Sequence, residues 1–152
     1  MISTQTWKPC GRMTLNQEGH PKFPEVESVP GLYRLTLDDG WFYIGETKDL
    51  NHRFWEYSHP TTGVIVEHRI NQALKNAGGA IVEILIGDQF FDKPTRCMIE
   101  TDEIRRARSE GKKVLNGGGT DKAYCLTLDI NYHEDQIAKL RHKLNALPTG
   151  EE

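Results

Sequence analysis

The stretch that decides the fold is residues 31–47, GLYRLTLDDGWFYIGET. Two apolar runs flank Asp38-Asp39-Gly40, and this arrangement predicts a β-hairpin. A loop of three residues would place Tyr33 and Tyr43 on the same face of the hairpin, one diagonal step apart. A loop of two residues, Asp39-Gly40, would place them on opposite faces, and aspartate-glycine favours this shorter loop. Turn chemistry alone therefore leaves the relation of the two tyrosines open.

The residues after the hairpin predict two helices and a third strand. Thr47 or Asp49 can cap a helix over residues 50–57, and a second helix is expected over 66–77 with Gly78 as its stop signal. The run AIVEILIG, residues 80–87, is rich in branched residues and predicts a strand.

The C-terminal third of the chain predicts two more helices. Pro94 or Thr95 opens a helix that extends to about residue 110. Residues 123–130 predict a short strand or an extended segment. Asn131, with Glu134 as its capping-box partner, can then begin a last helix. The apolar stripe of that helix consists of Ile137, Leu140 and Leu144.

These elements predict an α+β fold in which a small three-stranded antiparallel sheet is flanked by helices. Residues 1–29 contain Pro9, Pro21 and Pro24 and predict an irregular N-terminal arm. The expected organisation is therefore an arm over residues 1–29, a core over 30–119 and a C-terminal extension with one helix over 120–152.

Composition places the chain among ordinary globular proteins. Its 152 residues, 37% of them hydrophobic and 27% charged, predict one domain with a real core. The net charge of −3 argues against a protein that coats nucleic acid nonspecifically. The three cysteines lack a CxxC pair, so a disulfide framework or a zinc site, even at Cys10 and His20, is not favoured. The N-terminus has no apolar signal sequence and no run suits a membrane span, so we expect a cytoplasmic protein without membrane contact.

The two ends of the hairpin resemble a known motif. Gly31-Leu32-Tyr33 and Tyr43-Ile44-Gly45 are similar to the two tripeptides of the GIY-YIG nuclease family, with leucine in place of the first isoleucine. The following residues 47–54, TKDLNHRF, resemble the next stretch of the family, where a helix presents an arginine. The resemblance covers about residues 30–116 and implies a metal-dependent endonuclease that hydrolyses phosphodiester bonds in DNA.

The resemblance also implies roles for four side chains near the hairpin. Tyr33 would activate the attacking water, and Tyr43 would donate a hydrogen bond to the phosphate or to that water. Arg53 has a planar fork that suits two phosphate oxygens, and Tyr57, four residues later, shares its helix face. A tyrosine with a pKa near 10 needs a nearby cation to act as a base at neutral pH. Without the resemblance, both hairpin tyrosines would read as ordinary aromatic residues of a sheet face.

The implied metal ion is Mg²⁺ or Mn²⁺, which prefers carboxylate oxygen. In the family, the metal-binding glutamate precedes an apolar residue by four positions, and Glu100 and Ile104 satisfy that spacing. Glu103 stays in reserve, and either glutamate could instead be a surface carboxylate paired with a neighbouring arginine. Asn116 occupies the place of a supporting asparagine that bonds to backbone.

Other features bear on partners. His68 has a weak claim to the site, and His52 points elsewhere than Arg53. Basic residues gather between Arg96 and Lys113 and could follow a phosphate backbone. The expected partner is DNA, with a homodimer or a partner subunit that supplies targeting as further possibilities. The alternative function is a non-catalytic nucleic-acid-binding or interaction module on the same fold, for which the negative net charge is the best support. An apolar stripe left exposed on the last helix would favour a subunit of a larger assembly.

Overall fold

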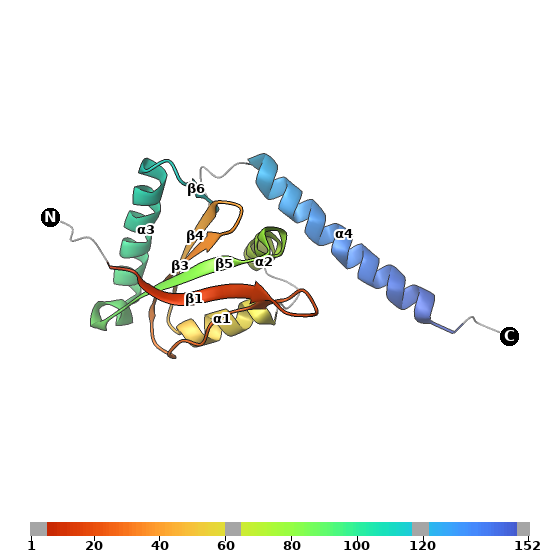
Figure 1. Ribbon diagram of the computed structural model, residues 1–152, viewed down its shortest axis with the longest axis horizontal. Coiled ribbons are helices and arrows are strands. Elements are labelled where there is room, and N and C mark those ends of the chain that lie inside the picture. The colour runs from red at the N-terminus through yellow and green to blue at the C-terminus, as the bar shows by residue number, and fades with distance from the viewer. Residues whose placement is uncertain (1–5, 60–64, 117–121, 149–152) are drawn as a thin grey trace.

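The computed structural model describes residues 6–59, 65–116 and 122–148, with the side chains of 65–68 and 122–125 left out (Figure 1). Its helices and strands are, in chain order, β1 (Lys8–Leu15), β2 (Pro21–Lys22), β3 (Gly31–Leu37), β4 (Trp41–Thr47), α1 (Leu50–Ser58), α2 (Ile65–Ala77), β5 (Ala80–Ile86), the short 3-10 helix η1 (Asp88–Phe91), α3 (Lys93–Ser109), β6 (Lys113–Val114) and α4 (Lys122–Ala146). The strands form one sheet in the order β2-β1-β5-β3-β4-β6. The fold is therefore α+β, as the sequence predicts.

The hairpin of β3 and β4 has the longer of the two loops that the sequence leaves open. Leu35 pairs with Tyr43 across the hairpin, and Tyr33 pairs with Gly45. Gly40 has a φ of +96°, and its amide donates to the Leu37 carbonyl at 2.9 Å. Because the loop has three residues, Tyr33 and Tyr43 lie on one face of the sheet, one diagonal step apart.

The two outer glycines of the hairpin are required by close approach. The ring of Tyr33 lies against Gly45, where an added Cβ would sit 2.4 Å from the Tyr33 Cζ atom. At Gly31 an added Cβ would sit 2.3 Å from the Leu85 carbonyl oxygen of β5. Neither position has room for a side chain. Gly45 therefore leaves space for the ring of Tyr33, and Gly31 lets β3 lie close beside β5.

Two apolar clusters cover the two faces of the sheet. On one face, Tyr33, Leu35 and Leu37 alternate along β3 and are buried with residues of α1 and α2, such as Phe54 and Leu74. On the other face, a smaller cluster joins the sheet to α3. Its buried members are Leu32, Ile44, Leu85, Phe90, Ala107 and Val114. The sheet is therefore the middle layer, with α1 and α2 on one side and α3 on the other (Figure 1).

The predicted three-stranded sheet is the middle of a larger one, and the prediction of an irregular N-terminal arm was wrong. β1 pairs antiparallel with β5, and Met13 on β1 is fully buried. The register of this pair shifts between Pro9 and Gly11, so the proline falls at a bulge where its missing N–H does not interrupt the ladder. At the other side of the sheet, β6 pairs parallel with β4.

The predicted strand or extended segment over residues 123–130 was also wrong. One continuous helix, α4, runs from Lys122 to Ala146, and Asn131 lies within it rather than at its N-cap. Leu128 is 1% exposed, and Arg69 on α2 donates two hydrogen bonds of 3.0 Å to the Asp129 carboxylate. Packing against α2 thus favours helix over the extended conformation that the branched and aromatic residues suggest.

The other predicted helices are confirmed, with sharper boundaries. Asp49, rather than Thr47, caps α1 by accepting from the His52 amide. α3 begins one residue before Pro94, and its cap is Asp92. Among the described residues, no helix combines the length and the apolar character needed to cross a bilayer.

Candidate active site

The centre of the candidate site is the phenol of Tyr33. The side chain projects from β3 toward α1 and is completely buried. Its oxygen lies 2.7 Å from the Tyr57 phenol oxygen and accepts from Nη1 of Arg53 at 3.4 Å. Arg53 and Tyr57 both lie on α1, one helical turn apart, so they face the same way. The structure therefore brings three of the predicted site residues together.

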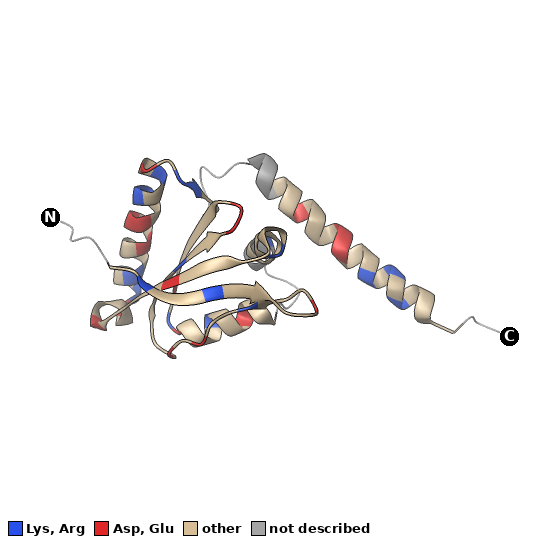
Figure 2. Cartoon of the chain, in the orientation of Figure 1, with Lys and Arg blue, Asp and Glu red and all other residues tan. Residues whose placement is uncertain are grey.

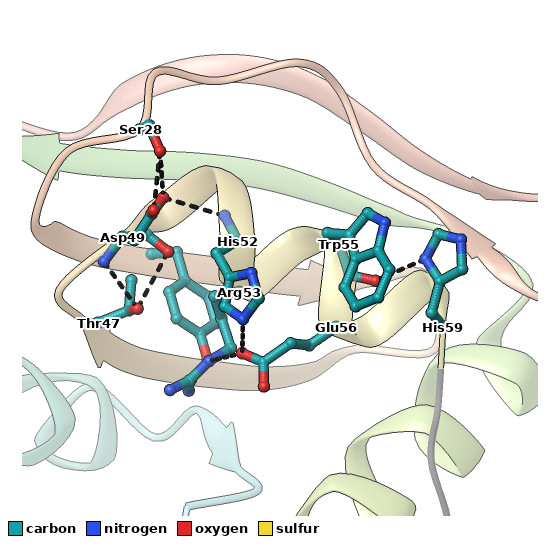
Figure 3. A network of polar contacts seen from close by, with 9 residues as sticks. Ser28, Thr47, Asp49, His52, Arg53, Trp55, Glu56 and His59 are labelled. Atoms are coloured by element: carbon teal, nitrogen blue, oxygen red, sulfur yellow. Dashed lines mark hydrogen bonds and ion pairs between the residues drawn. The ribbon is translucent and has the colours of Figure 1, made fainter.

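Helix α1 is fixed at its N-terminus by a polar network (Figure 3). The Asp49 carboxylate accepts from the His52 amide at 3.0 Å and from the Ser28 hydroxyl at 2.8 Å. These hydrogen bonds lower the pKa of Asp49, the amide bond having the largest effect. The Thr47 hydroxyl accepts from the Asp49 amide at 3.1 Å, which ties the end of β4 to the helix. This network sets the position from which Arg53 reaches the hairpin.

The Arg53 side chain is held from two sides. Its Nε donates to the Glu56 carboxylate at 3.2 Å, while Nη1 contacts Tyr33. Burial alone would lower the pKa of Arg53, but the phenols of Tyr33 and Tyr57 together with Glu56 raise it above its ordinary value. Arg53 is therefore a permanent, partly exposed positive charge beside the buried phenol.

Tyr43 completes the aromatic group from β4. Its ring centroid lies 6.0 Å from that of Tyr33, and Tyr57 lies 6.1 Å from Tyr33 in an edge-on arrangement. Burial raises the pKa of all three tyrosines, although Arg53 opposes the shift. At neutral pH the three phenols are therefore protonated, and each can donate one hydrogen bond.

Glu100 and Asn116 both lie along the outer edge of β4. At this edge the Leu115 amide donates to the Phe42 carbonyl at 2.7 Å, next to the pairing of β6. Asn116 then bonds both backbone groups of Ile44: its Oδ1 accepts from the amide at 3.0 Å and its Nδ2 donates to the carbonyl. The expected backbone bonding of Asn116 is thus observed.

Glu100 continues the same edge. Burial raises the pKa of Glu100, and the nearby Glu46 carboxylate raises it further. A hydrogen bond from the backbone N–H of Glu46 to the Glu100 carboxylate lowers this pKa, but by less. The charge of Arg53 lowers the pKa of Glu100, and the charge of Glu100 raises the pKa of Tyr43. Along this edge of β4, residue 42 therefore pairs with β6, residue 44 bonds Asn116 and residue 46 bonds Glu100. This edge places the carboxylate from α3 within electrostatic reach of the tyrosines.

A buried ion pair supports this edge and was not found from the sequence. Arg96 is 5% exposed, and its Nε donates to the Glu46 carboxylate at 2.9 Å. Its Nη1 donates to the Phe90 carbonyl at 2.8 Å. Arg96 is therefore no part of a basic surface. The sequence signal was the charge of Arg96 on α3, but nothing local indicated Glu46 as its partner.

The reserve glutamate has a different environment. Glu103 is 5% exposed and accepts from Arg106 at 3.3 Å. Glu100, by contrast, is only half-buried and interacts with Glu46, Arg53 and Tyr43. Of the two carboxylates, Glu100 is the one whose charge raises the pKa of Tyr43. The side chain of His68 lies outside the described residues, and that of His52 is exposed.

The N-terminal segment also contributes to the site, which sequence reasoning missed. Phe23, between β2 and β3, stacks on Phe54 with ring centroids 4.6 Å apart and on Tyr57 at 5.5 Å. Phe54 and Tyr57 both contact Tyr33, so Phe23 supports the two α1 side chains that pack on that phenol. The aromatic residue in a proline-rich stretch was the available signal, but its contact with α1 depends on the path of β1 and β2.

The basic residues near α3 form no continuous positive surface. Arg106 and Arg105 pair with Glu103 and Asp102 at 3.3 and 3.9 Å. The ammonium of Lys112 lies 4.7 Å from the Phe42 ring centroid, and that of Lys113 lies 5.5 Å from the Trp41 centroid. Figure 2 shows acidic and basic segments mixed along α3. Contact with a phosphate backbone would therefore be local.

The site suits a hard divalent cation held by few protein ligands. Among the described residues, no cluster of three or more His, Cys, Asp or Glu is found that could hold a metal ion. Magnesium, however, is commonly bound through one or two carboxylates together with water and substrate phosphate. Burial, and after it the Glu46 carboxylate, raises the pKa of Glu100, and a cation beside Glu100 would oppose both effects by stabilising the ionised carboxylate. The donor chemistry therefore fits Mg²⁺ or Mn²⁺ at Glu100.

Comparison with known proteins gives one limited likeness. No protein-family model matches the sequence, and no curated protein matches it. Among solved structures, the chain is similar to a mutant of bacteriophage T4 EndoII, with 21% sequence identity and a TM-score of 0.41. The likeness covers 51% of this chain and 64% of that one.

Proposed function

We propose that this protein is a metal-dependent DNA endonuclease of the GIY-YIG type. The observation that carries the proposal is the contact of the buried Tyr33 phenol with both Tyr57 and Arg53, at 2.7 and 3.4 Å. An isolated sheet tyrosine needs one partner for its hydroxyl, whereas this one is linked to a guanidinium and a second phenol beside a half-buried carboxylate. Such a set of groups is suited to holding a phosphate and a water molecule.

Arg53 would bind the phosphate. Its Nε and Nη1 are used by Glu56 and Tyr33, and a guanidinium has five N–H donors, so further donors are available for phosphate oxygens. Tyr43, with its protonated phenol, would donate another hydrogen bond to the same phosphate or to the attacking water. These donors would stabilise the negative charge that develops on the phosphate in the transition state.

Tyr33 would orient the attacking water and accept its proton. Because burial keeps the Tyr33 phenol neutral, the proton acceptor is the small fraction of phenolate, which Arg53 favours. Tyr57 would hold the Tyr33 oxygen in place through their hydrogen bond. Mg²⁺ or Mn²⁺, held by Glu100, would supply stabilisation of charge on the leaving oxygen when bound. Asn116 would keep β4 in register with this edge through its two bonds to Ile44.

A cleavage assay tests the proposal. Plasmid DNA and a branched DNA are incubated with the protein and Mg²⁺, and the natural chain is compared with Glu100→Ala and Tyr33→Phe. We expect cleavage by the natural chain and a loss of about 100-fold or more in each variant, as is typical when a group acting in the transition state is removed. The matched controls are Asp102→Asn on the same helix and Tyr132→Phe on α4, and both should cleave normally.

The second candidate function is a binding module on the same fold. The net charge of −3 and the internally paired arginines of α3 favour it. Binding of DNA without cleavage across several metals and substrates would support the module and refute the nuclease. Equal residual cleavage in the natural chain and in both site variants would indicate a contaminating nuclease.

A further inference from the structure

Helix α4 carries an apolar stripe that the chain itself leaves uncovered. Six large apolar side chains, five on α4 and one directly after it, are between 47% and 66% exposed: Leu126, Ile130, Ile137, Leu140, Leu144 and Leu147. In contrast, Leu128 is buried and Asp129 is bonded to Arg69 on α2. Beyond these residues the helix continues away from the domain (Figure 1).

The spacing of the stripe is that of a coiled coil. If Ile130 takes position a of a heptad, Ile137 and Leu144 also fall at a, and Leu126, Leu140 and Leu147 fall at d. His133 fills the remaining d position between Ile130 and Leu140. A helix that merely extended into water would not need apolar residues at both positions. The stripe is thus suited to another helix of the same pattern.

We propose that residues 130–147, the end of α4 and the leucine that follows it, pair with the same residues of a second copy of this chain in an antiparallel coiled coil. In the register that places Ile137 opposite Leu140 of the second copy, Ile130 lies opposite Leu147 of that copy. His133 lies opposite Leu144 of the second copy. The paired segment follows Leu128 and Asp129, which hold α4 against the domain, so the two domains lie at opposite ends of the coiled coil.

The charges along α4 select this arrangement. Glu134 and Asp135 precede the middle of the paired segment, whereas Lys139, Arg141 and Lys143 follow it. In the proposed register Glu134 and Arg141, both at position e, lie beside each other across the interface, and twofold symmetry repeats the pair. Shifting the register by one heptad would place Glu134 beside Glu134 of the second copy, or Arg141 beside Arg141. Like charges thus oppose both neighbouring registers.

A parallel arrangement has no such complementarity. Parallel helices bring position g of one chain near position e of the next heptad in the other. That geometry places Asp129 near Glu134 of the second copy and Gln136 near Arg141. It gives one repulsive pair and no attractive one. The antiparallel dimer is therefore the arrangement that the sequence of α4 favours.

The mass of the full chain in solution tests the proposal and is independent of any nuclease activity. Sedimentation velocity over a range of protein concentrations should show a reversible dimer of twice 17.3 kDa. Leu140→Asp should give a monomer, because the carboxylate would be buried against Ile137 of the second copy. The matched control is Ala138→Glu, an exposed position on the outer side of the same helical turn, and it should remain dimeric.

Charge reversal tests the direction of the helices. Glu134→Arg and Arg141→Glu should each weaken the dimer by about tenfold, because each creates two repulsive contacts. The double variant Glu134→Arg/Arg141→Glu should restore the dissociation constant to that of the natural chain. A monomer at all concentrations, a dimer unaffected by Leu140→Asp, or a double variant weaker than either single one would each overturn the proposal.

Discussion

At the scale of the residue, the proposed chemistry depends on the environment of Tyr33. A phenol that is completely buried yet bonded to a guanidinium combines two opposing influences on its proton. Burial raises the pKa of Tyr33, and the charge of Arg53 lowers it, with burial the larger effect. The resting site therefore holds neutral tyrosines beside a charged arginine. Any role of Tyr33 as a proton acceptor must then depend on pH.

The pH dependence of cleavage follows from this environment. Since the pKa of Tyr33 is raised above its usual 10, the phenolate fraction should increase about tenfold per pH unit at every pH below that value. We expect the single-turnover rate with Mg²⁺ to rise with a slope near one between pH 6 and about 9, with no plateau.

The control for this profile is Tyr33→Phe, whose residual rate should change little with pH over the same range. A plateau of the natural chain near neutral pH would mean that a group other than Tyr33 accepts the proton. The DNA-binding affinity is measured at each pH, so that weaker binding is not mistaken for slower cleavage.

At the scale of the element, the site is built by the hairpin and by the outer edge of β4. Gly45 leaves space for the Tyr33 ring against β4. Asn116 and Glu100 bond the backbone of Ile44 and Glu46 on the same strand. α1 contributes Arg53 and Tyr57 from one face because Asp49 fixes where the helix begins. Tyr33, Asn116 and Glu100 thus all depend directly on β4, and α1 depends on it through Tyr33, so a change in β4 should disturb every part of the site.

Gly45→Ala tests this dependence. The added methyl would lie 2.4 Å from the Tyr33 ring, so Tyr33 must move. We expect a loss of about 2 kcal/mol or more in the free energy of unfolding, which is typical of overpacking a core, measured by urea denaturation. Cleavage should fall as well, because the Tyr33 oxygen would leave Tyr57 and Arg53.

A double-mutant cycle supplies the control. In a Tyr33→Leu background the ring is absent, so Gly45→Ala should then cost much less than it does in the natural chain. Equal costs in both backgrounds would show that Gly45 is required for a reason other than the seat of Tyr33.

The sequence predicted the centre of the fold better than its margins. The hairpin, β5 and the first three helices have strong local signals, namely alternating or helical apolar patterns bounded by glycines and capping residues. The joining of β1 to β5 was missed because Pro9, Pro21 and Pro24 indicated an irregular arm, whereas the bulge that accommodates Pro9 exists only once β5 is in place. The start of α4 was missed because it depends on Leu128 and Asp129 packing on α2.

The candidate site was predictable to the extent that it lies on sequence motifs. Tyr33, Arg53 and Tyr57 follow from the hairpin and one helical turn, and the structure places them in contact. The pair of Arg96 and Glu46 joins α3 to β4, and no local pattern links residues so far apart. The loop length was open for the same reason, since aspartate-glycine suits two turns and the pairing of β3 with β5 and β4 decides between them.

At the scale of the whole molecule, the sheet separates two kinds of group that the proposed reaction needs. The tyrosines and Arg53 belong to the α1 face, and Glu46 and Arg96 belong to the α3 face. Glu100, on α3, is close enough to the first set for its charge to raise the pKa of Tyr43 and for the charge of Arg53 to lower its own pKa. A carboxylate kept half-buried beside Glu46 destabilises the fold in its ionised form, which is reasonable if a cation normally occupies the site.

Glu100→Gln therefore has opposite expected effects on stability and on function. The raised pKa means that ionised Glu100 disfavours folding at pH values above the ordinary carboxylate range. The melting temperature of the variant should be at or above that of the natural chain at pH 7, and the difference should disappear at about pH 4 and below, where both states are protonated.

The most direct test of the nuclease account compares binding and cleavage of the same DNA by this folded variant. DNA affinity is measured by fluorescence anisotropy in Ca²⁺, and single-turnover cleavage is measured in Mg²⁺. We expect Glu100→Gln to bind DNA within about threefold of the natural chain and to cleave it at least about 100-fold more slowly. Cleavage by Glu100→Gln at the rate of the natural chain would contradict the nuclease proposal.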